Sequence, residues 1–254
     1  MNLKEFDYLF DLNGYYHLKK VISKKDISVA NKKIEKIENS NEKQLPHNVH
    51  FGKKKNNKDL YISNILEIDP IFEKFALNTI FLKLIKRVTG NSNYYRLNHA
   101  VAMTKLKRDT YTYLHMGNIP HHPKVFYFVK DKKIFSNITK ILIPLCNNTS
   151  KDGGFAVIPG SHKSNFIRPY DNNPKNNTSC LIPIEAKPGD AVIFTEALAH
   201  GSMINKSNKV RRILSYMYTV KYMPDWTKFN LNFSNKYQKS ASKKIKKLIK
   251  LKKD

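Results

Sequence analysis

Cysteine, acidic side chains and long apolar runs are all scarce in this chain of 254 residues. Two cysteines, Cys146 and Cys180, are too few for a disulfide framework. Each lies in or beside an apolar run, so we expect reduced, buried thiols. No apolar run reaches the length of a membrane span, and residues 1–7 lack the hydrophobic core of a signal peptide. These absences predict a cytoplasmic protein.

Acidic residues are few relative to basic ones. The chain has 20 Asp and Glu against 46 Lys and Arg, which gives a formal net charge of +26. Such an excess is typical of proteins that bind nucleic acid, membranes or phosphorylated molecules. Here lysine is spread along the whole chain and arginine is scarce, whereas phosphate-binding proteins usually use arginine as well. The net charge is therefore best explained by a general abundance of lysine. No specific nucleic-acid partner is predicted.

Hydrophobic residues make up 41% of the chain, which is enough for a packed core. Apolar residues recur at helical spacing in residues 26–40 and 68–88, and we expect the second segment to form one or two helices on the outside of the fold. Residues 41–59 are charged and rich in Asn, which indicates a surface loop. Strand-like apolar runs follow at residues 94–103, 125–128, 138–145, 155–158, 191–194 and 213–218.

Residues 188–211 contain the most informative pattern. A Pro-Gly-Asp turn leads into the apolar strand at residues 191–194. His200 follows, and Gly201 allows the backbone to pass close to whatever this histidine faces. Arg211 stands at the head of the next apolar strand. A histidine at the edge of one strand and an arginine on the next can point into one pocket, where a neutral imidazole binds a metal and a guanidinium pairs with a carboxylate.

Two motifs together resemble those of the phytanoyl-CoA dioxygenase family. One is His-Gly-Ser-x-x-Asn-x-Ser-x-x-x-Arg at residues 200–211, and the other is Gly-Gly-Phe-Ala-Val-Ile-Pro-Gly-Ser-His-Lys at residues 153–163. The resemblance extends roughly from Phe10 to Tyr218. Members of this family are Fe(II)- and 2-oxoglutarate-dependent oxygenases built on a double-stranded β-helix.

The resemblance implies a mainly β protein, a double-stranded β-helix (jelly roll, cupin-like) with flanking helices. We expect one oxygenase-like domain at residues 1–235, with its helical N-terminal third packed on a β-helix core at about residues 94–220. A lysine-rich C-terminal tail, residues 236–254, follows. Two interpretations of this tail stay open: weak contact with a membrane or an acidic surface, and a solvated terminal helix, which is favoured. Its narrow apolar face consists of Ile245, Leu248, Ile249 and Leu251.

The same resemblance implies that His115 and His200 bind the iron, and that Arg211 pairs with the far carboxylate of 2-oxoglutarate. Arg212 should point to the opposite face of its strand. His115 occupies the position of the histidine in the family's His-x-Asp motif, but Gly117 stands where the aspartate is found.

Because glycine has no side chain, the third protein ligand of the iron is left open. A subgroup of the family carries Leu-His-x-Gly together with Phe-Thr-Glu-Ala-Leu-x-His-Gly, and residues 114–117 and 194–201 match both. Chloride could fill the position, as in related halogenases. A replacement carboxylate, Glu196 or Asp152, could also reach the iron, with His121 as a reserve ligand. Finally, the protein could have lost the iron altogether.

We therefore expect a dioxygenase that uses Fe(II) and the cosubstrate 2-oxoglutarate to hydroxylate a small organic molecule. A halogenase and a non-catalytic, cupin-like binding protein are the alternatives. The loop at residues 164–179 is expected to form part of the pocket rim. There Arg168 and Tyr170 would meet the substrate, for which an anionic molecule is one option.

Overall fold

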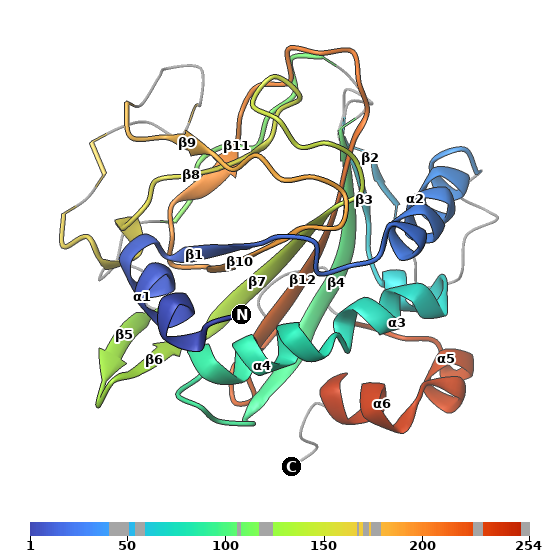
Figure 1. Ribbon diagram of the computed structural model, residues 1–254. Coiled ribbons are helices and arrows are strands. Elements are labelled where there is room, and N and C mark those ends of the chain that lie inside the picture. The colour runs from blue at the N-terminus through green and yellow to red at the C-terminus, as the bar shows by residue number, and fades with distance from the viewer. Residues whose placement is uncertain are drawn as a thin grey trace.

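Two antiparallel sheets face each other, and helices flank the larger sheet (Figure 1). This arrangement confirms the predicted fold class, a double-stranded β-helix with flanking helices. The computed structural model describes residues 1–40, 51–53, 59–105, 108–116, 124–166, 168–169, 173, 179–225 and 231–249.

Within the described residues the larger sheet has seven strands and the smaller has three. The order in the larger sheet is β1 (Tyr15–Leu18), β10 (Ala191–Thr195), β7 (Ile138–Pro144), β12 (Arg211–Val220), β4 (Tyr95–Lys105), β3 (Asp59–Ile62) and β2 (Phe51–Lys53). The order in the smaller sheet is β11 (His200–Ser202), β8 (Phe155–Val157) and β9 (Ile182–Pro183). A separate hairpin consists of β5 (Tyr127–Lys130) and β6 (Lys133–Ser136). β12 is a central strand, since it pairs with both β7 and β4.

The helices of the N-terminal part begin at capping residues. They are α1 (Leu3–Asn13), α2 (Lys24–Glu38), α3 (Pro70–Ala76) and α4 (Thr79–Val88), with 3-10 turns at Ile65–Glu67 and Ser161–Lys163. The Ser23 hydroxyl accepts a hydrogen bond from the Asp26 amide at the start of α2. Asn78 accepts bonds from the first amides of α4, so the predicted helical segment at residues 68–88 divides here into two helices.

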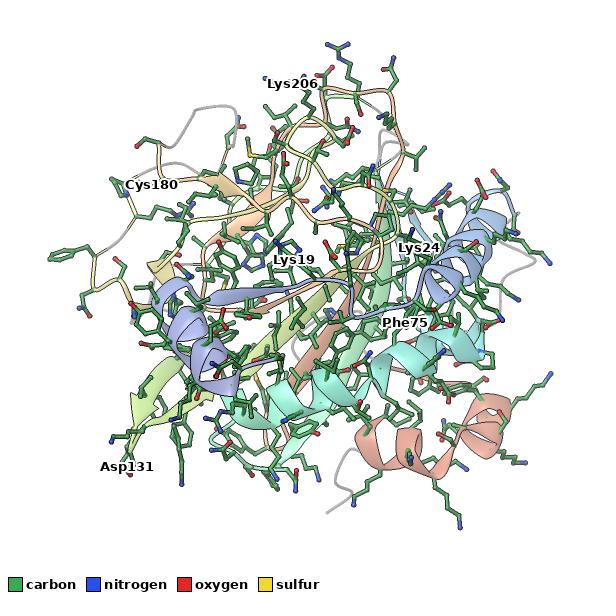
Figure 2. The ribbon with its side chains drawn as sticks, in the orientation of Figure 1. Lys19, Lys24, Phe75, Asp131, Cys180 and Lys206 are labelled. Carbon is green, nitrogen blue, oxygen red and sulfur yellow. The ribbon has the colours of Figure 1, made fainter. Side chains whose placement is uncertain are left out.

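The apolar faces of α3 and α4 pack against the larger sheet. Phe72, Phe75 and Phe81 are almost completely buried, and Phe75 lies on α3 in Figure 2. Two tyrosines of β12 add polar links to α3. Tyr216 donates to the Phe72 carbonyl at 3.1 Å, and Tyr218 donates to the Ala76 carbonyl at 2.8 Å. These bonds satisfy two buried hydroxyls and fix α3 on the sheet.

The prediction of a surface loop at residues 41–59 is wrong in part. Residues 51–53 form β2, an edge strand that pairs with β3, and Asp59 begins β3. The charged, Asn-rich composition shows no apolar alternation, so it gave no sign of these strands. They form because the backbones of β2 and β3 pair with each other.

The C-terminal segment packs on the protein, so the prediction of a solvated terminal helix is wrong. This segment forms α5 (Asn235–Ser240) and α6 (Lys243–Ile249), and α6 contacts β4. Ile245 and Leu248 are buried in the main core, at 0% and 7% exposure. Ser234 bonds the Glu67 carboxylate through its amide at 2.7 Å and its hydroxyl at 2.6 Å. The apolar face is thus used within the fold, while Leu251 lies outside the described residues.

One of the two thiols, that of Cys180, is not buried as the sequence predicted. Both cysteines are free, but Cys146 is only half-buried and Cys180 is exposed on the surface (Figure 2). The prediction of a buried thiol is therefore wrong for Cys180, which lies in a turn rather than in a packed strand. Lys24 and Lys206 are exposed, in keeping with lysines that are spread over the surface. None of the described helices combines the length and the apolar character needed to cross a membrane.

Candidate metal centre

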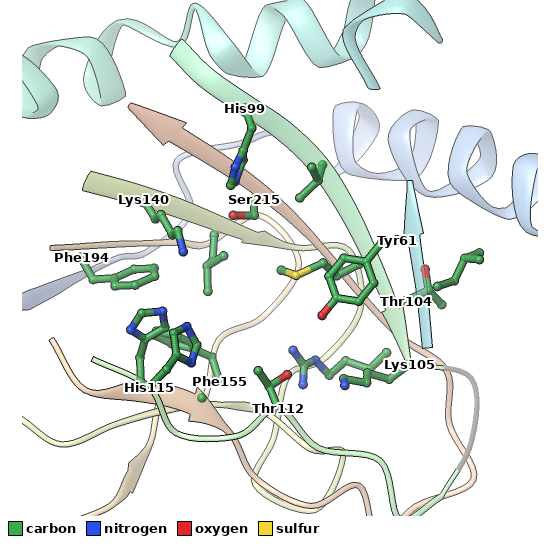
Figure 3. Close-up of a pocket in the computed structure, with 17 residues that line it drawn as sticks. Tyr61, His99, Thr104, Lys105, Thr112, His115, Lys140, Phe155, Phe194 and Ser215 are labelled. Atoms are coloured by element: carbon green, nitrogen blue, oxygen red, sulfur yellow. The ribbon is translucent and has the colours of Figure 1, made fainter. Parts of the chain in front are cut away.

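A cavity of about 250 Å³ lies between the two sheets (Figure 3). Strands β4, β7, β10 and β12 of the larger sheet supply most of its walls, and β8 and β11 of the smaller sheet contribute Phe155, His200 and Gly201. The polar residues that line it are Tyr61, His99, Thr104, Lys105, Thr112, His115, Lys140, His200, Arg211 and Ser215. The side chains predicted to bind iron and 2-oxoglutarate, His115, His200 and Arg211, therefore line one cavity.

His115 and His200 are neighbours through their backbones. The His115 amide donates to the His200 carbonyl at 3.1 Å, and the His200 amide donates to the His115 carbonyl at 3.0 Å. This isolated antiparallel pair places the two imidazole rings side by side, with 4.0 Å between their centroids. A short piece of sheet thus brings together two histidines that are far apart in the sequence.

Backbone carbonyls fix the tautomer of both rings. Nδ1 of His115 lies 2.9 Å from the Tyr113 carbonyl, and Nδ1 of His200 lies 2.7 Å from the Leu198 carbonyl. A carbonyl only accepts, so each Nδ1 carries the proton and each Nε2 keeps its lone pair. Burial lowers the pKa of His115, and it lowers the pKa of His200 well below its ordinary value. Both imidazoles are therefore neutral, as metal ligands must be.

Glu196 completes a group of potential metal ligands. Its carboxylate oxygen Oε2 lies 3.8 Å from Nε2 of His200 and 2.6 Å from the ammonium of Lys140. One ligand atom each of His115, Glu196 and His200 lies within 4.8 Å of the others. Glu196 is only 2% exposed, and its amide donates to the Ile138 carbonyl at 3.0 Å. Two imidazoles and one carboxylate form the donor set that suits a non-haem iron.

Aromatic side chains enclose the histidines on the sheet side. The ring of Phe194 meets His200 edge-on at 4.8 Å between centroids, and Phe155 lies 6.0 Å away. Both phenylalanines are almost fully buried. This apolar wall limits the rotation of His200 and keeps bulk water from one side of the site.

Arg211 and Arg212 point to opposite faces of β12, as predicted. Arg211 lines the cavity, is 5% exposed and donates to the Gly153 carbonyl. Arg212 leaves the cavity and forms a two-pronged pair with Glu38 of α2, at 2.6 to 2.9 Å. Side chains of successive residues alternate across a strand, which explains the division of roles.

The remaining predicted site residues do not join this group, or lie outside the described part of the chain. Asp152 does not line the cavity. Its carboxylate instead accepts a hydrogen bond from the Thr149 hydroxyl at 2.7 Å. Arg168 lines a neighbouring surface pocket, and its charge helps to lower the pKa of His115 after burial and other causes. Gly117, His121 and Tyr170 lie outside the described residues.

Several cavity residues were not predicted to belong to the site. His99 lines the cavity together with Lys105 of the same strand. Burial, followed by the charge of Lys140, lowers the pKa of His99 to about 3. Lys140 was also missed, although a lone lysine in the apolar run of β7 is a usable signal. On β4, the alternation from His99 to Lys105 would have placed both on one face.

A protein whose jelly roll encloses two neutral histidines, a carboxylate and an arginine belongs structurally with the metal-dependent jelly-roll proteins. Comparison with known families gives a more specific result. The family model "Phytanoyl-CoA dioxygenase (PhyH)" matches residues 10–213, which is most of the chain. The protein is therefore a member of the phytanoyl-CoA dioxygenase family, as the two sequence motifs indicated.

Curated relatives are distant and longer. A dioxygenase from Aspergillus fumigatus, af480, is 30% identical over 108 residues, which cover 42% of this chain and 34% of the relative. The phytanoyl-CoA dioxygenase of Arabidopsis thaliana is 27% identical over 182 residues, or 65% of this chain and 59% of the relative. The chain thus spans between about a third and about three fifths of these relatives.

Solved structures share the fold. HygX from Streptomyces hygroscopicus, solved with nickel, 2-oxoglutarate and hygromycin B bound, superimposes with a TM-score of 0.74 at 20% identity, and covers 89% of this chain and 90% of HygX. The epimerase SnoN from nogalamycin biosynthesis reaches 0.66 at 13% identity, with 89% and 87% coverage. At these identities the likeness establishes the fold.

Proposed function

We propose that this protein is an Fe(II)- and 2-oxoglutarate-dependent dioxygenase that hydroxylates a small organic molecule. One observation carries the proposal: His115, Glu196 and His200 meet at a cavity that Arg211 also lines. Family membership and the names of the curated relatives agree with it. The bound ligands of HygX show that this fold can hold a metal and 2-oxoglutarate together.

The donor set fits an iron ion. Metal–nitrogen and metal–oxygen bonds measure roughly 2.0–2.2 Å, so two ligands of one ion lie within about 4.4 Å of each other. The 3.8 Å between His200 and Glu196 meets this limit, and the 4.8 Å bound on the whole group exceeds it by only a few tenths of an ångström. Small side-chain rotations close such a gap. When bound, Fe(II) would supply the oxidation of the substrate by O₂, coupled to conversion of 2-oxoglutarate to succinate and CO₂.

We infer that Glu196 supplies the third ligand. A halogenase needs the carboxylate position open to chloride, and a non-catalytic protein would have lost the ligand set. In this chain the aspartate is absent at Gly117, but Glu196 brings a buried carboxylate to the same two histidines. This observation favours a hydroxylating enzyme over both alternatives.

The other residues bind and orient the cosubstrate. Arg211 would pair with the far carboxylate of 2-oxoglutarate, a charge-assisted interaction of about 1.5–3 kcal/mol. Leu142, Phe155 and Phe194 would exclude water from the metal. The Nε2 lone pairs of His115 and His200 are available to bind the metal, because the Nδ1 atoms donate to backbone carbonyls.

Four finer statements belong to the same proposal. The substrate is anionic, and Arg168 belongs to the rim that receives it. The protein is cytoplasmic, in keeping with two free thiols. The catalytic domain comprises residues 1–235, and the lysine-rich segment that follows packs on it through Ile245 and Leu248. The exposed lysines of α5 and α6 make weak contact with acidic surfaces.

Anaerobic titration of the metal-free protein with Fe(II), followed by 2-oxoglutarate, tests the proposal. We expect a visible charge-transfer band that is lost in His115→Ala and His200→Ala and unaffected by chloride. Arg212→Ala, on the opposite face of β12, is the matched control and should keep the band. A chloride-dependent band would favour the halogenase, and failure to retain iron would favour the binding protein.

A further inference from the structure

The hairpin of β5 and β6 projects from the body of the protein beside α1 and α4 (Figure 1). Asp131 and Lys132 form its two-residue turn, and both have positive φ values, of 50° and 58°. Two left-handed residues in succession are typical of a type I′ turn, whose twist matches that of a two-stranded hairpin. The tip of the hairpin therefore has a defined shape and lies apart from the two main sheets.

Aromatic side chains gather on this hairpin and on the two turns beside it. Five of them line one groove of about 270 Å³ and are here called the aromatic hairpin surface: Tyr94, Phe126, Phe128, Phe135 and Tyr222. Tyr94, Phe128 and Tyr222 are 44%, 46% and 65% exposed. None of the five lines the cavity of the metal centre. Exposed apolar patches of this kind mark places where a partner binds.

The rings of the aromatic hairpin surface hold one another in place. Phe128 stacks on Phe135 with 4.9 Å between the ring centroids, and Tyr94 stacks on Tyr222 at 6.4 Å. Side chains that are fixed before binding lose less conformational entropy when a partner arrives. The surface is therefore prepared for contact in the free protein.

Lysines accompany these rings. Lys130 and Lys133 face each other across the hairpin, and Lys132 lies in its turn. All three are exposed, and the tip has these three lysines against one aspartate, Asp131. On the neighbouring turn, the Lys221 ammonium lies 5.6 Å from the centroid of the Tyr94 ring. The partner should therefore be anionic as well as partly apolar.

We propose that the aromatic hairpin surface docks the protein on an anionic lipid bilayer. Exposed aromatic rings such as Phe128 and Tyr222 would enter the headgroup region, which aromatic side chains favour at membrane surfaces. The lysines would meet the negative charges of the lipids. A bilayer satisfies both halves of the surface at once, because acyl chains accept the rings while headgroups meet the cations.

Nucleic acid fits this surface less well. A base stacks on an open ring face, whereas one face of Phe128 and one of Tyr94 are already covered by a neighbouring ring. Phosphate-binding sites also tend to use arginine. Arg96, which follows Tyr95 in the chain, is only 3% exposed and pairs with Asp225 at 2.7 Å.

Flotation of the full chain with lipid vesicles tests the proposal. The vesicles contain either phosphatidylcholine alone or an equimolar mixture of phosphatidylcholine and phosphatidylserine. Phe128→Ala removes a ring from the hairpin, and Tyr222→Ala removes one from the neighbouring turn. The double variant Lys130→Gln/Lys133→Gln removes two charges and keeps the length of the side chains.

Two variants outside the surface serve as matched controls. Phe166→Ala changes another exposed phenylalanine, which is 82% exposed. Lys206→Gln changes an exposed lysine that lies at the top of the molecule in Figure 2, whereas Asp131 marks the hairpin tip at the lower left. Both controls should bind vesicles as the wild type does.

We expect the wild type to bind the mixed vesicles and not phosphatidylcholine alone. Phe128→Ala and Tyr222→Ala should each weaken binding by about 10-fold, the lower end of the effect of burying an aromatic side chain. The double lysine variant should weaken it by about 25-fold, since each lysine near an anionic surface contributes about fivefold. Added salt should weaken binding of the wild type because it screens these charges.

The inference is overturned if the wild type ignores the mixed vesicles, or if the three surface variants bind them as the wild type does. Binding that is lost only in Lys243→Gln/Lys244→Gln would assign the contact to α6 instead. Binding of a single-stranded oligonucleotide without binding of vesicles would make this a nucleic-acid site. If Phe128→Ala does not fold, Tyr222→Ala decides, because Tyr222 lies in an exposed turn outside the hairpin.

Discussion

The carboxylate of Glu196 lies 3.8 Å from Nε2 of His200 and 2.6 Å from the ammonium of Lys140, and all three side chains are largely buried. The same oxygen, Oε2, makes both approaches. A metal held by His200 would therefore share or compete for an oxygen that Lys140 already neutralises. This geometry links metal binding to the stability of the protein, and it leads to the first two predictions.

Glu196→Gln should weaken metal binding by at least about 10-fold, the lower end of what loss of a supporting group costs at a metal site. The amide keeps the volume of the side chain but removes the negative charge. Titration of the metal-free protein with Ni(II) or Co(II) measures the affinity, with Glu185→Gln as the control at an exposed carboxylate. Wild-type affinity in Glu196→Gln would mean that the histidines hold the metal without this carboxylate.

Lys140→Met should destabilise the metal-free protein by about 3–5 kcal/mol, because it leaves the Glu196 carboxylate buried without its partner. A divalent metal supplies a new partner, so Ni(II) should raise the Tm of Lys140→Met more than that of the wild type. The double variant with Glu196→Gln should lose less stability than the two single variants together. Equal rises in Tm for Lys140→Met and wild type would contradict the link.

Arg211→Ala and Arg212→Ala should have opposite consequences, although the two residues are adjacent. Loss of Arg211 should weaken 2-oxoglutarate binding by roughly 10- to 150-fold, equivalent to about 1.5–3 kcal/mol. Loss of Arg212 should leave that binding unchanged but lower the stability, because Arg212 pairs with Glu38 at 2.6 Å. Calorimetric binding and urea denaturation of both variants separate the effects, and similar effects on binding would contradict the assigned register of β12.

Stability should fall as the pH is lowered from about 6.5, the ordinary pKa of histidine. Burial lowers the pKa of His99 to about 3 and that of His162 to about 4, so the unfolded chain binds protons that the folded protein does not. Each such histidine contributes a slope of about 1.4 kcal/mol per pH unit until the pH reaches its folded pKa. Urea denaturation at several pH values should therefore show a shallower dependence in His99→Gln, and parallel curves would exclude this cause.

Ile245→Ala should destabilise the protein by about 2–5 kcal/mol, as expected for truncation of a fully buried isoleucine. Lys247→Ala, on the exposed side of the same helix, should change the stability by less than about 0.5 kcal/mol. Denaturant unfolding of both variants is the measurement. A negligible effect of Ile245→Ala would mean that α6 is not part of the folded core in solution.

Much of the site could be predicted because it depends on local periodicity. Residues alternate across a strand, so Arg211 and Arg212 must face opposite sides of β12 once the strand is recognised. The apolar spacing of residues 68–88 similarly predicted helices on the outside of the fold, since only one side of each helix is apolar and can be buried. The histidine and arginine motifs then identified the family, and the fold followed from the family.

The elements that prediction missed depend on partners distant in the sequence. β2 exists because β3 supplies its hydrogen bonds, and Ile245 and Leu248 are buried because α6 packs on the protein, where it contacts β4. Cys180 was predicted to be buried from its neighbours in the chain, yet it lies in an exposed turn. A local pattern does not specify which surface a segment will meet.

The sequence by itself determined the family, the jelly roll, the two histidines and the inward-facing arginine, because these follow from motif spacing and from the twofold alternation of strands. Only the tertiary structure brought a carboxylate, that of Glu196, close to the two histidines. Glu196 lies beside the histidines and Lys140 pairs with Glu196 because strands remote in the chain pair in one register. Charge at a buried site depends on which side chains share the same few ångströms, and folding alone sets those distances.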